Sequence, residues 1–69
     1  MDHTKKIILE SIEYYENDIK EYKAMLSKNK EIIDNPSTSQ KKREAFEMLN
    51  EIILREMEND QNRIKELIS

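Results

Sequence analysis

The chain has 69 residues, no cysteine, no glycine and a formal net charge of −3, and 39% of its residues are charged. This length allows one small domain over residues 1–69, and the lack of cysteine excludes disulfide bonds as a source of stability. The negative balance disfavours broad affinity for nucleic acid or anionic membranes, and no apolar run reaches the ~18 residues of a membrane span. We therefore expect a cytoplasmic protein.

The first predicted helix runs from about residue 4 to residue 34. Asp2 or Thr4 can serve as its N-cap, and neither proline nor glycine interrupts the segment. Its apolar residues recur at alternating steps of four and three, the heptad spacing of helices that pack along their length. Asn29 is the one amide in this row and is interpreted as a residue that sets the register. We call the row the central stripe; in this helix it comprises Ile8, Ile12, Tyr15, Ile19, Tyr22, Leu26, Asn29 and Ile33.

The connection is predicted at residues 35–37, which hold the only proline of the chain. A proline pushes the preceding residue out of the α region and so ends a helix. Ser37 and Gln40 have the spacing of a capping box, which predicts that the second helix starts at about residue 38. Two rival caps, Ser39 or an asparagine at 35 followed by the proline, would move the boundary by about two residues.

The second predicted helix runs from about residue 38 to residue 68. Its stripe residues are spaced ~3.7 apart on average, which predicts a nearly straight or loosely coiled pair. Two long helices with a short connection predict an antiparallel hairpin. If the chain reverses at residues 35–37, Leu26 should face Leu49 and Tyr22 should face Ile53. The stripe here comprises Phe46, Leu49, Ile53, Met57, Asp60, Ile64, and Leu67 or Ile68.

Further apolar residues lie to one side of each stripe, in the same angular sense on both helices. Since the helices are antiparallel, these residues should share one face of the hairpin. A small hairpin rarely buries enough apolar surface alone, so we predict an all-α fold in which two copies pair through this face as a four-helix bundle. Docking of a helix from another protein is the alternative. We call this face the apolar flank; it comprises Ile7, Tyr14, Met25, Ile32, Ala45, Met48 and Ile52.

Asp60 stands within the apolar stripe of the second helix, one turn after Glu56. A buried carboxylate is unfavourable unless it is hydrogen-bonded, so we expect a tyrosine hydroxyl or solvent to satisfy it, in a polar layer that sets the register. A carboxylate metal site would need Glu-x-x-His pairs, and the single histidine, His3, lies at the start of the chain. We therefore expect neither a metal nor a cofactor.

Cations cluster near the connection, and several fall in the first turns of the second helix, where the helix dipole disfavours positive charge. The simpler interpretation is solvated surface charge. The alternative is a contact with an anion or with RNA, although no aromatic residue lies nearby to stack on bases. The cations in question are Lys28, Lys30, Lys41, Lys42 and Arg43.

No catalytic motif is present, and we expect no enzyme activity and no small-molecule substrate. The predicted hairpin resembles the phosphatases of sporulation signalling in architecture, but their Ser-Gln-Glu-Leu-Asp motif is absent, because Lys41 and Lys42 follow Ser39-Gln40. The leading hypothesis is a protein–protein interaction module, a small adaptor or inhibitor acting as a homodimer. The alternatives are an RNA- or polyanion-binding regulator that uses the cations near the connection, and a small phage-type inhibitor of a host enzyme.

Overall fold

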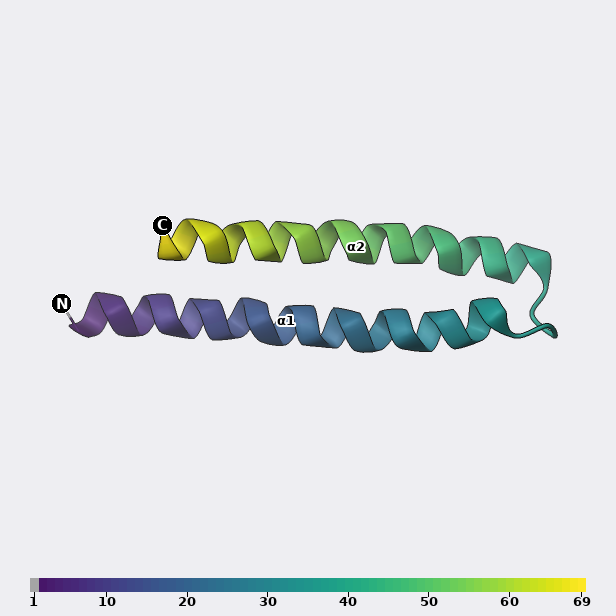
Figure 1. The fold of residues 1–69 in the computed structure, drawn as a ribbon, viewed down its shortest axis with the longest axis horizontal. Coiled ribbons are helices and arrows are strands. Elements are labelled where there is room, and N and C mark those ends of the chain that lie inside the picture. Colours follow the sequence, from purple (N-terminus) through teal and green to yellow (C-terminus); the bar gives the residue numbers. More distant parts are fainter. Residues whose placement is uncertain (1) are drawn as a thin grey trace.

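The computed structural model describes residues 2–69, with side chains from residue 3 onward. It contains two α-helices, α1 at Asp2–Asp34 and α2 at Gln40–Ile68, joined by residues 35–39. The helices run antiparallel and side by side, which confirms the predicted all-α hairpin (Figure 1). The molecule is a rod of 56 × 15 × 12 Å with a radius of gyration of 16.2 Å. A compact domain of this length would have a radius of gyration of about 11 Å.

The connection is longer than predicted, and α2 starts two residues later. Ser39 is the N-cap: its backbone is extended, and its Oγ accepts a hydrogen bond from the Lys42 amide at 3.2 Å. The predicted capping box at Ser37 is wrong. The Ser37 amide instead donates to the Asn35 side-chain oxygen at 2.8 Å, so these residues form an Asx turn around the proline.

The longer connection shifts the register of the two helices by about one turn. The side-chain amide of Asn29 donates to the side-chain oxygen of Asn50 at 2.9 Å. An antiparallel pair matched in this way places Leu26 level with Ile53, so the predicted pairing of Leu26 with Leu49 is wrong. The physical reason is visible in Figure 1, where α2 begins beyond the end of α1.

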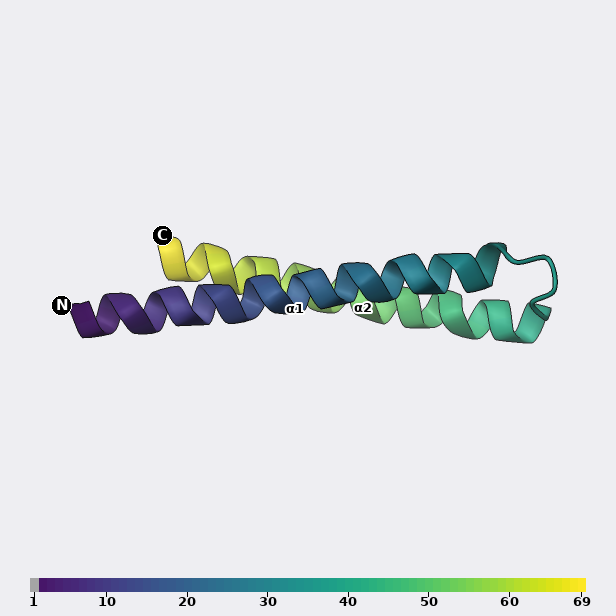
Figure 2. The same ribbon diagram turned by 90° about the horizontal axis from the view of Figure 1, so that it is seen from below.

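The central stripe of α2 also differs from the predicted one at one position. Leu49 is 38% exposed, whereas Asn50, one residue later, turns toward α1. With Asn50 in its place the stripe of α2 alternates steps of three and four, so both helices follow the heptad spacing. The helices cross near their middles (Figure 2). The covered positions of α2 are Arg43, Phe46, Asn50, Ile53, Met57, Asp60, Ile64 and Leu67.

The core of the hairpin is thin. Within residues 3–69, Ile53 is the one buried apolar side chain, at 3% exposed, and the other apolar stripe residues are half-buried. Two helices can cover a stripe from one direction only, so its edges stay open to solvent. Neither α1 nor α2 has an apolar stretch long enough to cross a membrane.

Candidate interaction surface

The apolar flank lies along one side of the hairpin. Met25 and Ile52 each precede a stripe residue by one position, as Ile32 does, and so lie about 100° round their helices from the stripe. In an antiparallel pair the same offset on both helices faces the same side. Ile32 is half-buried and Ile52 is 52% exposed. Met48 was predicted to lie on this flank, but it precedes Asn50 by two positions and therefore lies on the outer face of α2, at 66% exposed.

Leu49 belongs to this flank, and its predicted place in the central stripe is wrong. It precedes the stripe residue Asn50 and is exposed. A strict heptad count back from Ile64 and Met57 places Asn50 in the stripe and Leu49 beside it, so the signal was present in the sequence. With Leu49 included, the flank is densest toward the turn.

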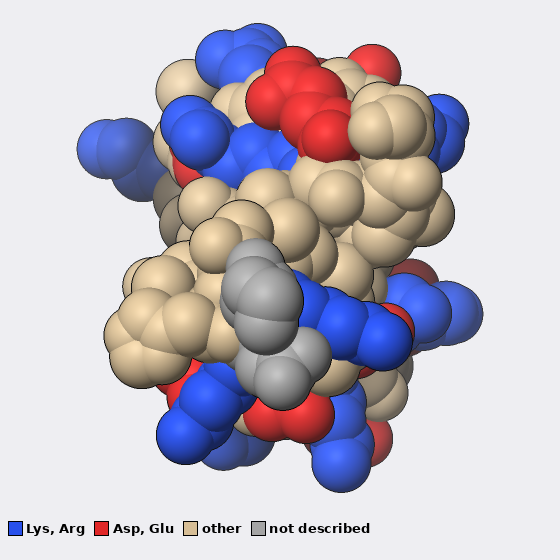
Figure 3. All heavy atoms as spheres, turned by 90° about the vertical axis from the view of Figure 1, so that its left-hand side faces the viewer, with Lys and Arg blue, Asp and Glu red and all other residues tan. Residues whose placement is uncertain are grey.

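The opposite side of the hairpin carries fewer exposed apolar residues. Leu54 follows Ile53 by one position and therefore emerges on the side away from Ile52; it is 54% exposed. Leu9 and Ile68 are also exposed. Seen from the end that bears the termini, side chains of both charge signs stand around the rod, with other residues between them (Figure 3). The flank is thus distinguished by its density of apolar side chains.

A carboxylate cluster lies in the middle of the hairpin. Asp60 is 7% exposed, as its place in the stripe predicts, and its Oδ2 atom has no hydrogen-bond partner, so the expected tyrosine hydroxyl does not satisfy it. Burial raises the pKa of Asp60 to about 6. Asp18 adds to this effect through its charge and because it can accept a hydrogen bond from Asp60 once Asp60 is protonated; the charge of Glu56 also raises the pKa, and Arg63 lowers it. Burial, then Asp18, Glu56 and Asp60, also raise the pKa of Tyr22 above its usual value. Over residues 3–69, no three His, Cys, Asp or Glu side chains are grouped to hold a metal ion.

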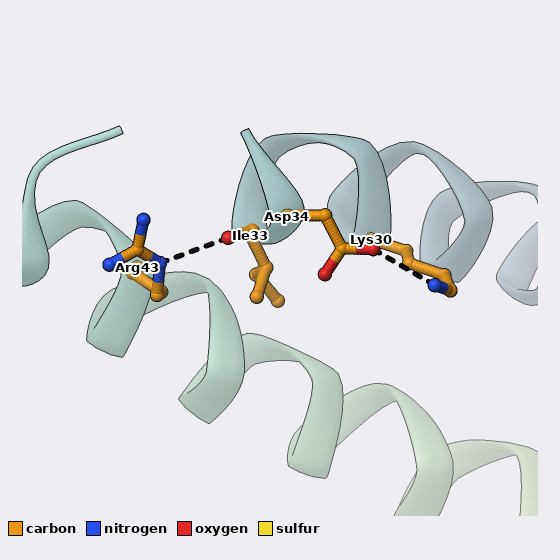
Figure 4. A network of polar contacts seen from close by, with 4 residues as sticks. All are labelled: Lys30, Ile33, Asp34 and Arg43. Carbon is orange, nitrogen blue, oxygen red and sulfur yellow. Dashed lines mark hydrogen bonds and ion pairs between the residues drawn. The ribbon is translucent and has the colours of Figure 1, made fainter. Parts of the chain in front are cut away.

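Arg43 is engaged in the turn. Its Nε atom donates to the Ile33 carbonyl at 2.9 Å, at the C-terminal end of α1 (Figure 4). Its Nη2 atom donates to the carbonyl oxygens of Asn35 and Thr38 at 3.3 and 3.2 Å. Arg43 is therefore a cation placed where the carbonyls of α1 present partial negative charge, and the dipole of α1 favours it there.

The other cations near the turn differ in their surroundings. Lys30 pairs with Asp34 at 2.9 Å on the surface of α1 (Figure 4), and hydrogen bonding and charge from Asp34 raise the pKa of Lys30. Lys28, Lys41 and Lys42 are exposed. Arg43 and Lys30 thus have partners within the chain, whereas the other three are open to solvent.

No protein-family model matches the chain, and neither a curated protein nor a solved structure shows detectable similarity to it.

Proposed function

We propose that the protein is a small interaction module that pairs with a second copy of itself through the apolar flank, forming a four-helix bundle. The observation that carries this proposal is the row of exposed apolar side chains on one side of the hairpin. Ile52 is more than half exposed, Met25 is 45% exposed, and Leu49 joins them at 38%. Covering such residues with a partner lowers the free energy, because apolar surface is removed from water.

The exposed area of the hairpin supports the same proposal. The chain has a mass of 8.3 kDa and exposes 5768 Å². A compact monomer of that mass would expose about 4,600 Å², so the hairpin carries a surplus of about 1,200 Å². Each partner in an interface of standard size buries about 800 Å². Pairing through one flank can therefore remove most of the surplus.

A second copy fits this surface because the flank occurs once on every chain, and a two-fold axis brings identical patches together. Pairing two hairpins also closes the open edge of each thin core. The resulting bundle would present outer helix faces rich in charged residues, which is where an adaptor or inhibitor would contact another protein. In this proposal the dimer is the functional unit.

Sedimentation velocity over a micromolar to millimolar range tests the proposal. The wild-type chain should sediment with twice the 8.3 kDa mass and dissociate on dilution. Ile52→Asp should weaken pairing by about tenfold or more, because a buried isoleucine contributes ~1.5–3 kcal/mol and a buried charge opposes association. Leu54→Asp is the matched control: Leu54 has nearly the same exposure but lies on the opposite side.

Two outcomes would contradict the proposal. A monomer at every concentration, with helical circular dichroism intact, would overturn self-association. Equal effects of Ile52→Asp and Leu54→Asp would show that the flank is not the interface.

A further inference from the structure

The carboxylates of Asp18 on α1 and Asp60 on α2 lie together in the middle of the hairpin. Asp60 is almost fully covered, yet its Oδ2 atom has no hydrogen-bond partner. The groups that face it are Asp18 and, less directly, Tyr22 from α1, and Glu56 and Arg63 from α2. Arg63 is the single cation in this set. Two adjacent carboxylates oppose each other's ionisation. A buried oxygen atom without a hydrogen-bond partner is also unfavourable.

We propose that Asp18 and Asp60 form a shared proton-binding site, and that taking up one proton tightens the middle of the hairpin in mildly acidic solution. The proton comes from solvent, and no other bond forms or breaks. A carboxyl group protonated on one residue offers an O–H donor to an oxygen of the other. Uptake of this proton removes the repulsion between two negative charges, and the new hydrogen bond can satisfy the oxygen that lacks a partner.

A proton suits this site better than a metal ion does. A divalent cation requires several oxygen ligands around one point, and within residues 3–69 no such group of three acidic or histidine side chains exists. The site is also close to water, because the hairpin is two helices thick. The proton can therefore exchange with solvent without unfolding of the chain.

The sign of the pH dependence follows from the raised pKa of Asp60. Its pKa is about 6 in the folded chain, against a usual value of 3.8. Between these values the folded state holds more protons than the unfolded state, so stability falls as pH rises. The loss of folding stability caused by Asp60 is largest above its pKa in the folded chain. It disappears as pH falls toward the pKa of Asp60 in the unfolded chain.

The site also adjoins the apolar flank. Asp18 lies seven residues before Met25, and Glu56 lies seven residues after Leu49, so each carboxylate shares the helix face of a flank residue. A partner that covers the flank would cover these carboxylates as well. Where the two copies pair, a point that rests on the proposed function, proton uptake should also favour the paired form.

Thermal unfolding of the full chain, followed by circular dichroism between about pH 8 and about pH 5, tests the proposal. The wild-type Tm should rise as pH falls, corresponding to about a tenfold or greater increase in the folding constant. Asp60→Asn should unfold at a higher temperature than wild type at pH 8 and lose most of this slope. Glu58→Gln removes an exposed carboxylate from the same helix and should keep the wild-type slope.

A carbon-13 NMR titration of the wild-type side-chain carboxyls gives the same answer without any variant. The Asp60 signal should titrate near pH 6. An Asp60 midpoint near 4, or a wild-type Tm that stays level between pH 8 and pH 5, would overturn the shared site.

Sedimentation at both ends of the pH range keeps this inference separate from the proposed function. A monomer throughout, with Asp60 still titrating near pH 6, contradicts self-association and leaves the proton site standing. A dimer whose Asp60 titrates near 4 contradicts the proton site alone.

Discussion

Replacing Arg43 with methionine is expected to loosen the turn while leaving the central stripe packed. Methionine keeps an unbranched apolar side chain at a half-buried position and removes the guanidinium. The guanidinium donates to the carbonyls of Ile33, Asn35 and Thr38 at 2.9 to 3.3 Å, and to the side-chain oxygen of Gln40 at 3.3 Å. Without it, the carbonyl of Ile33 at the end of α1 loses the donor that satisfies it.

The size of the effect follows from these contacts. A hydrogen bond that involves a charged group contributes about 1.5–3 kcal/mol, and the cation at the end of α1 adds about 0.3–1 kcal/mol. The three contacts at 3.2 to 3.3 Å are long and partly exposed, so we expect them to add little stability to that of the hydrogen bond with Ile33. We expect a loss of about 2–3 kcal/mol, which for a chain of this size lowers the Tm by roughly 10–20 °C.

Urea and thermal unfolding at one fixed protein concentration measure this loss. Lys42→Met is the control, since Lys42 is exposed and its change should stay within about 0.5 kcal/mol. Arg43→Lys should recover little, because a lysine cannot reach several carbonyls with one planar fork. Equal melting of Arg43→Met and Lys42→Met would refute the reasoning, because it would mean that the guanidinium contacts give no net stability.

Two further predictions concern polar groups that shape the hairpin. Asn29→Leu should lower the free energy of unfolding by about 1–3 kcal/mol, because it leaves the Asn50 amide without its partner. Leucine at both positions 29 and 50 should restore stability, which a double-mutant cycle in urea checks. The NMR signals of the double variant should broaden, because no buried amide pair then fixes the register of the two helices. Ser39→Ala should cost about 1 kcal/mol through loss of the N-cap, whereas Ser37→Ala should stay within about 0.5 kcal/mol, and equal losses in urea unfolding would contradict the assigned cap.

The candidate sites differ in how far the sequence could locate them. Met25, Ile32 and Ile52 were placed beside the stripe by their spacing alone, because a helix face is set by residue number. Asp60 was recognised as a carboxylate among apolar residues for the same reason. The residue of the first helix that faces Asp60 could only be narrowed to several candidates, because it depends on the register between the two helices.

The role of Arg43 was out of reach for a related reason. It stood among cations in the first turns of a helix, where local rules make positive charge unfavourable. The carbonyls of Ile33 and Asn35 that accept its hydrogen bonds belong to the other arm of the turn. A pattern read along one helix contains no information about the end of its neighbour.

The amino-acid order by itself determined two long helices, a break at Pro36 and the faces on which apolar residues gather, because these follow from backbone sterics and helical periodicity. The tertiary structure alone decided the register, and with it the pairing of Asn29 with Asn50 and the meeting of Asp60 with Asp18. The physical reason is that two extra residues in the connection slide one helix along the other by about a turn. Such a slide preserves the periodicity of each helix while changing every contact between them.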